Sequence, residues 1–206
     1  MAKKNLIFLD TETSGVDLNR DFIIELACVR VNPDCNTFEI MKEDIFHTYL
    51  NPDCDIHAGS QKVHGISKEF LKDKPSFDQI VDSFLDFIRD DILVAHNAPF
   101  DINFLNKELI NINKLTLSNE VIDTLIMARK LYPGSQVGLD ALRRRINMAP
   151  RGYHSALEDV MTLRSVYEYM SRPTQDDLFA SQEKENKTLA KYTLSNKLVS
   201  QNKIKT

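Results

Sequence analysis

The feature that most constrains this chain is an apolar run that ends in two carboxylates. Residues 6–9 read Leu-Ile-Phe-Leu, and Asp10 and Glu12 follow in the stretch "DTE". A run that is apolar at every position predicts a strand buried on both faces. Side chains two apart in a strand point to the same side, so Asp10 and Glu12 face one spot close to the core. Because buried carboxylates are costly unless they are paired, hydrogen-bonded or bound to metal, the sequence predicts a cation there.

The remaining pattern alternates between short apolar strands and amphipathic helices. Three early strands in a row predict an antiparallel or mixed start to a sheet, and the later alternation of strand and helix predicts an α/β fold. Strands are expected near residues 5–11, 22–32, 46–50 and 92–97, with a turn at 51–53 and a short strand that runs into a helix over 121–134. Further helices are expected near residues 75–90, 100–110, 138–147 and 154–170.

Composition narrows the classes of protein. The 206 residues are 42% hydrophobic, enough for one domain with a core plus a tail. No apolar run approaches the roughly 20 residues of a membrane helix, and the start shows no signal-peptide layout. Three scattered cysteines without a C-x-x-C motif predict reduced thiols in a cytoplasmic protein. The net charge of -4 argues against a protein that holds duplex nucleic acid by charge alone.

The last predicted helix carries a carboxylate on its buried side. Ser155-x-x-Glu158 fits a capping box with Ser155 as the N-cap, which places Asp159 at the fourth helical position. His154 is the residue before the cap, and these two positions meet in space as in a hydrophobic staple. The sequence therefore predicts that His154 and Asp159 lie side by side.

A second acidic position occurs in "HNAPFD". Asn97 is the expected N-cap of a helix after a buried strand, and Asp101 lies in the first turn. An acid there is also a common partner for the helix dipole, and Asp123 is similarly expected to be a helix cap. Several converging carboxylates suit Mg²⁺ or Mn²⁺, and two such ions can clamp an in-line displacement at phosphorus. A histidine that titrates near neutrality is suited to take a proton from water.

Taken together, the motifs resemble the DEDDh family of 3′–5′ exonucleases. They are "DTET" at residues 10–13, "HNAPFD" at 96–101, and "HSALED" at 154–159 with H-x-A-x-x-D spacing. Within the family, "VHGIS" at 63–67 and the run from "ARKLYPG" to "LDAL" at 128–142 are similar to the epsilon, or proofreading, subunits of bacterial replicative polymerases. The likeness covers about residues 5–170.

The resemblance implies a ribonuclease-H-like mixed sheet flanked by helices, in an exonuclease domain over residues 1–173. It implies two divalent cations, Mg²⁺ or Mn²⁺, held by Asp10, Glu12, Asp101 and Asp159, with His154 as general base. The residues implied to contact the substrate are Thr11, Thr13, His64, Asn97 and Phe100. The implied reaction hydrolyses the terminal phosphodiester of single-stranded or frayed DNA.

Residues 174–206 are polar and are expected to form a flexible tail. "QDDLF" resembles a sliding-clamp-binding motif through Gln175, Leu178 and Phe179, although a chance Leu-Phe pair is the alternative. In the family the tail binds the polymerase catalytic (alpha) subunit, and 189–199 is the candidate segment here. Two other functions stay open, namely an exoribonuclease or oligonucleotide trimmer, and an inactive exonuclease-fold module that bridges clamp and polymerase.

Overall fold

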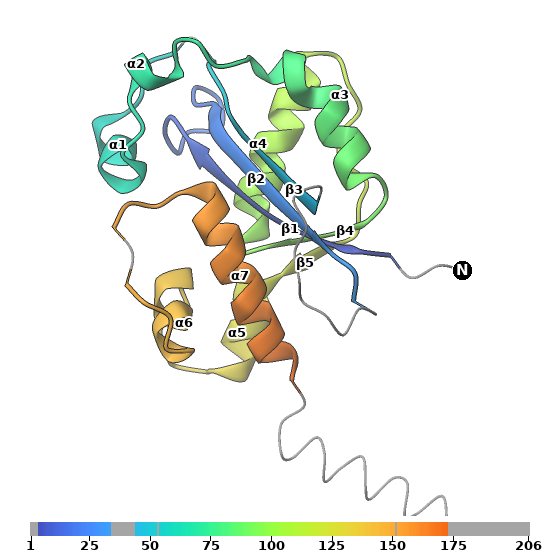
Figure 1. Ribbon diagram of the computed structural model, residues 1–206, viewed down its shortest axis with the longest axis vertical. Coiled ribbons are helices and arrows are strands. Elements are labelled where there is room, and N and C mark those ends of the chain that lie inside the picture. Colours follow the sequence, from blue (N-terminus) through green and yellow to red (C-terminus); the bar gives the residue numbers. More distant parts are fainter. Residues whose placement is uncertain (1–3, 34–43, 53, 151, 173–206) are drawn as a thin grey trace, which may run out of the picture. The chain divides into compact units, whose positions relative to one another are not determined.

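The structure is a computed structural model that describes residues 4–33, 44–52, 54–150 and 152–172 (Figure 1). The chain up to Met170 forms one compact unit. The predicted clamp motif, the tail and the domain boundary at residue 173 lie outside the described residues. Within those residues, no helix is long and apolar enough to cross a membrane.

A five-stranded mixed sheet lies at the centre of the unit, in the order β3-β2-β1-β4-β5. The first three strands pair antiparallel, whereas β4 pairs parallel with β1, and β5 with β4. This arrangement confirms the predicted mixed sheet, in which the apolar run of residues 6–9 forms the central strand. The strands are β1 (Leu6–Thr13), β2 (Ile23–Val31), β3 (Ile45–Tyr49), β4 (Ile92–Ala95) and β5 (Val121–Asp123).

Helices cover both faces of the sheet. Five of them confirm the predicted segments with ends shifted by a few residues, whereas α1 and α2 were not predicted because they are short and carry no apolar stripe. The helices are α1 (Ala58–His64), α2 (Lys68–Leu71), α3 (Phe77–Ile88), α4 (Ala98–Asn111), α5 (Thr124–Leu131), α6 (Leu139–Arg145) and α7 (Ala156–Ser171).

The central strand is buried on both faces, as predicted. Ile7 and Leu9 belong to the core cluster that contains the apolar faces of α3 and α4. Phe8 packs against α7, where its ring meets that of Tyr167 at a centroid distance of 5.4 Å. Since side chains alternate along a strand, Asp10 and Glu12 continue the face of Phe8 toward α7. Thr11 continues the opposite face, toward α4.

Candidate active site

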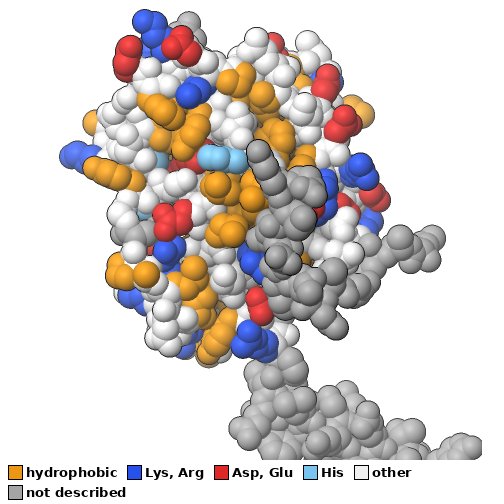
Figure 2. Space-filling model, in the orientation of Figure 1, with side chains coloured by type: hydrophobic (Ala, Val, Ile, Leu, Met, Phe, Trp, Pro, Cys, Tyr) orange, Lys and Arg blue, Asp and Glu red, His pale blue; other side chains and the backbone are white. Residues whose placement is uncertain are grey.

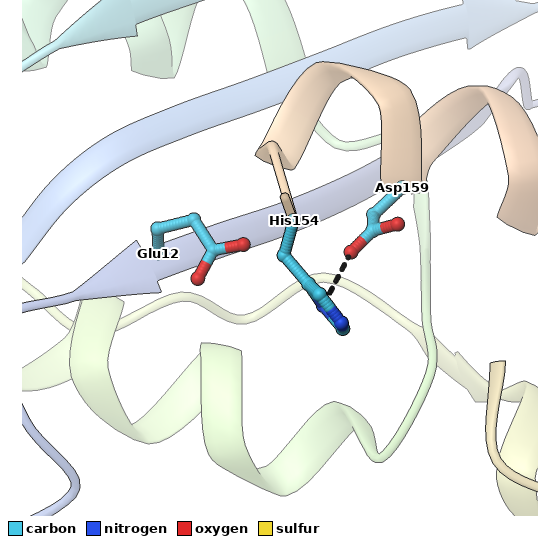
Figure 3. Close-up of side chains that lie close together, drawn as sticks. All are labelled: Glu12, His154 and Asp159. Carbon is cyan, nitrogen blue, oxygen red and sulfur yellow. Dashed lines mark ion pairs between the residues drawn. The ribbon is translucent and has the colours of Figure 1, made fainter. Parts of the chain in front are cut away.

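A cluster of three potential metal ligands lies at the C-terminal end of β1. One ligand atom each from Glu12, His154 and Asp159 lies within 4.8 Å of the others (Figure 3). Nδ1 of His154 is 3.3 Å from Oδ2 of Asp159, which confirms that these two side chains are neighbours. The helix begins at Ala156, so His154 stands just before it and Asp159 lies in its first turn, as the capping pattern predicted.

Asp101 reaches the same strand from α4. Its side chain is 3% exposed, and Oδ1 accepts hydrogen bonds from the backbone N–H of Thr11 at 3.0 Å and from the Thr11 hydroxyl at 2.8 Å. Burial raises the pKa of the Asp101 carboxyl from 3.8 to about 7, although the bonds from Thr11 oppose the rise and the charge of Asp123 adds to it. The anion is therefore poorly stabilised by the protein alone.

Asp10 lies on the same strand, directly before Thr11. Burial raises the pKa of the Cys28 thiol, and the charges of Asp101 and Asp10 add to the rise, so both carboxylates act on one point of the sheet. The structure thus brings Glu12, His154 and Asp159 together and places Asp10 and Asp101 beside the same strand end. Carboxylate oxygens are the donors that Mg²⁺ and Mn²⁺ prefer, and buried anions call for a compensating cation, so these residues fit the implied metals.

His64 approaches the site from the unpredicted helix α1. Its Nδ1 accepts a hydrogen bond from the backbone N–H of Ile66 at 3.0 Å, so in the neutral ring the proton is on Nε2. Burial lowers the pKa of His64, which keeps the ring neutral near pH 7. Nε2 is buried and has no hydrogen-bond partner within the described part of the chain. His64 therefore presents a buried donor; the backbone of Thr13 interacts with the ring and opposes the fall in its pKa, although Nε2 makes no hydrogen bond of normal geometry within the described residues.

Two backbone contacts hold α1 against the site. The N–H of His57 donates to the carbonyl of Ser14 at 2.8 Å, and the N–H of His154 donates to the carbonyl of Val63 at 3.0 Å. Gly65 ends the helix in a left-handed conformation with φ 73°, and a Cβ there would lie 3.1 Å from the ring of Tyr153. Glycine is therefore required at the junction between α1 and the loop that carries His154.

The other residues expected to bind substrate occupy varied positions. The Thr13 hydroxyl is buried and donates to the carbonyl of Gly15 at 2.5 Å. Asn97 precedes α4 as predicted, but its backbone is left-handed, with φ 66°, and its N–H donates to the Asp123 carboxylate at 3.1 Å. Phe100 is half-buried against Phe104.

Asp123 is the N-cap of α5, as expected, because its carboxylate also accepts from the N–H of Leu125. His96 packs beside this turn, with Nδ1 3.0 Å from the Thr124 hydroxyl. Both residues are thus engaged in the local structure around β4 and β5.

Sequence reasoning missed two acidic neighbours of His154. Oδ2 of Asp140, on α6, lies 3.7 Å from Nε2 of His154, opposite the contact with Asp159. Glu25, near the start of β2, bonds to Ser155 and Ala156, which follow His154 directly. A charge within the apolar run "IIELACV" was the available signal for Glu25.

The surface around the site is partly apolar. Figure 2 shows hydrophobic side chains gathered in several patches on one face of the molecule. Tyr153 and Val63, on the two segments joined by the His154 backbone contact, are 67% and 46% exposed. Carboxylates are therefore bordered by side chains that suit flat, apolar partners.

Comparisons with known proteins agree with this geometry. The family model described as "Exonuclease" matches residues 7–167. DNA polymerase III subunit epsilon of Rickettsia felis is 44% identical over 175 residues, which cover 81% of this chain and 74% of that protein. The subunit of the same name from Escherichia coli K12 is 40% identical over 172 residues, which cover 78% of this chain and 69% of that protein.

Solved structures share the fold. One titled "Exonuclease X in complex with 5′ overhanging duplex DNA" superimposes with a TM-score of 0.62 at 25% identity and covers 80% of this chain and 90% of that one. Escherichia coli exonuclease I with a dA16 oligonucleotide gives a TM-score of 0.65 at 15% identity, over 86% of this chain and 45% of that one. The chain belongs to the exonuclease family, within the group of DNA polymerase III epsilon subunits, and is a 3′–5′ exonuclease.

Proposed function

We propose that this exonuclease removes mispaired 3′-terminal nucleotides for a bacterial replicative DNA polymerase, by two-metal-ion hydrolysis of the last phosphodiester. The observation that carries the proposal is the cluster of Glu12, His154 and Asp159 beside a buried Asp101. The epsilon relatives support the role in replication, and the titles of the solved neighbours support DNA as the substrate. Bacterial DNA replication takes place in the cytoplasm, so we propose that the protein works there.

The residues that would hold the metals are Asp10, Glu12, Asp101 and Asp159. When bound, two divalent cations activate the attacking water and stabilise the leaving oxygen. His154 accepts the proton of that water at Nε2, because Nδ1 faces the Asp159 carboxylate at 3.3 Å. Asp159 thereby also fixes the orientation of the imidazole ring. Asp140 lies close to Nε2, so its carboxylate has to move away from this nitrogen when the water binds there.

Substrate recognition would combine one hydrogen bond with apolar contact. The Nε2–H of His64 is a buried donor suited to an oxygen of the terminal nucleotide. The exposed ring of Tyr153 offers a surface on which a base can stack. A mispaired end reaches such a site more readily than a paired one, because its unstacking costs less.

Two protein partners complete the proposal. The relatives are named as polymerase subunits, which supports binding to the polymerase catalytic (alpha) subunit. We propose that Gln175, Leu178 and Phe179 bind the sliding clamp. Removal of residues 174–206 is expected to abolish clamp binding in a pull-down and to leave the hydrolysis of free single-stranded DNA unchanged.

The test uses 5′-labelled DNA primers with a matched or mismatched 3′ end, a matching RNA strand, and Mg²⁺ or EDTA. Stepwise shortening of DNA is expected, faster on the mismatch and lost in EDTA and in the His154→Ala and Asp10→Ala variants. Faster shortening of RNA would instead identify an exoribonuclease. An inert protein that still binds the clamp would identify a bridging module and refute the two-metal site.

A further inference from the structure

Glu25 is a buried carboxylate that bonds directly to the segment carrying His154. It is fully buried near the start of β2. Its Oε1 lies 2.8 Å from Nε2 of His47 and accepts a hydrogen bond from the Ser155 hydroxyl at 3.0 Å. Its Oε2 accepts from the backbone N–H of Ala156 at 3.1 Å, so Glu25 binds the start of α7 from 131 residues away.

The position of Glu25 in the sheet is electrostatically unfavourable. It stands opposite Glu12 in the pairing of β1 with β2, and paired residues of an antiparallel ladder point to the same face. Like charges at directly opposite positions destabilise a sheet, and burial of a carboxylate adds a desolvation cost. An apolar side chain there would remove both costs. What Glu25 offers in return is its contacts with the start of α7.

Those contacts bear on the distance between Glu12 and the pair formed by His154 and Asp159. Glu12 is carried by β1, whereas His154 and Asp159 belong to the start of α7. Glu25 ties that start to β2, the strand paired with β1, through a side-chain and a backbone donor. The sheet ladder and the Glu25 bonds together fix where His154 and Asp159 lie relative to Glu12.

The same carboxylate acts on the second histidine of the site. Burial is the largest influence on the pKa of His64 and lowers it, and the charge of Glu25 opposes this fall. His154 and His64 are also joined through the backbone bond from His154 to Val63. A shift of Glu25 would therefore disturb both histidines.

We propose that Glu25 is a positioning residue that holds His154 and Asp159 opposite Glu12 and does not itself touch the substrate. The inference rests on the proposed roles of those residues. The test variant is Glu25→Leu, which removes the acceptors, and Glu25→Gln is the conservative rescue because its amide oxygen can still accept from Ala156. Glu108→Leu is the matched control, because Glu108 is also buried and accepts a backbone N–H, that of Ile23 at 3.2 Å.

The measurements are kcat and KM on single-stranded DNA with Mg²⁺, Tm, and the ring ¹H–¹⁵N NMR signals of His154 in metal-free protein. Glu25→Leu is expected to lower kcat by about 10–100-fold with KM unchanged, as for other groups that orient a metal-site residue. Its His154 signals are expected to move, and Glu25→Gln is expected to restore most of kcat. Glu108→Leu is expected to lower Tm and to leave kcat and the His154 signals unchanged.

The inference is overturned if Glu25→Leu keeps the wild-type kcat, or if Glu108→Leu lowers kcat by the same factor. If Glu25→Leu does not fold, Ser155→Ala replaces it, with a smaller loss of kcat and a shift of the His154 signals expected. Unmoved His154 signals in Ser155→Ala would then refute it. A wild-type protein that does not shorten DNA refutes the proposed function instead, and the NMR signals still decide whether Glu25 positions His154.

Discussion

Replacing Asp101 with asparagine should make the metal-free protein more stable while it destroys the activity. Both hydrogen bonds from Thr11 end on Oδ1 of Asp101, so an amide oxygen can keep them and the substitution mainly removes a charge. Burial raises the pKa of Asp101 from 3.8 to about 7, so the folded protein binds this proton more tightly than the unfolded chain does. The contribution of this carboxyl to stability is therefore fully present below about pH 4 and is lost as the pH rises through about 7.

The upper limit of the effect follows from the same rise in pKa. At 1.36 kcal/mol for each pKa unit, the change from 3.8 to about 7 corresponds to a cost on the order of 4 kcal/mol above pH 7. Urea unfolding in EDTA should show Asp101→Asn more stable than the wild type at about pH 8 by part of this amount, and equally stable at about pH 4. Mg²⁺ should then stabilise the wild type more than the variant, because ligand binding to the folded state adds to its stability.

Asp55→Asn is the control for a general effect of removing negative charge. Asp55 is exposed, and the hydrogen bond and charge of Lys68 lower its pKa, so its loss should give no gain in stability at high pH. The reasoning is refuted if Asp101→Asn is no more stable than the wild type at about pH 8, or if its gain is the same at both pH values.

Three further outcomes are expected. His154→Gln should lower kcat by about 10²–10⁴-fold in the exonuclease assay with an unchanged circular dichroism spectrum, since it removes a general base. Gly15→Ala should lower the free energy of unfolding by about 1–3 kcal/mol in urea titrations, because its Cβ would lie 2.2 Å from the Asp21 carboxylate. Cys28 should resist a thiol reagent in the native protein, because burial raises its pKa, whereas the partly exposed Cys54 should react.

The elements that the sequence predicts well are those with long, regular apolar patterns. The run at residues 6–9 indicated a central strand, and the helical stripe of residues 77–88 indicated α3, because burial on one or two faces imposes these periods. The contact between His154 and Asp159 was also predictable, because it depends only on local helix geometry at the N-terminus of α7.

The parts that were missed depend on contacts between distant segments. Helix α1 has no apolar stripe, and its place is set by backbone bonds to Ser14 and His154. Glu25 falls within the predicted strand at residues 22–32, but nothing near it in sequence shows that Ser155 and Ala156 lie against it. The approach of Asp140 to His154 likewise follows from the packing of α6 beside α7.

The end of β1 is where a site built from both faces of this sheet can form. Along the buried part of the strand, Ile7 and Leu9 face α3 and α4 while Phe8 faces α7, so groups on the two faces are separated by the sheet. Where the apolar run stops, the Thr11 hydroxyl donates a hydrogen bond to Asp101 of α4, and Glu12, on the other face, lies near His154 just before α7. Because side chains alternate along β1, its end brings together acids from α4 and α7, two helices on opposite faces of the sheet. Asp101 and Asp159, the acids from these two helices, are both buried. A bound cation would offset the cost of burying their charge, so the fold is expected to be less stable without metal than with it.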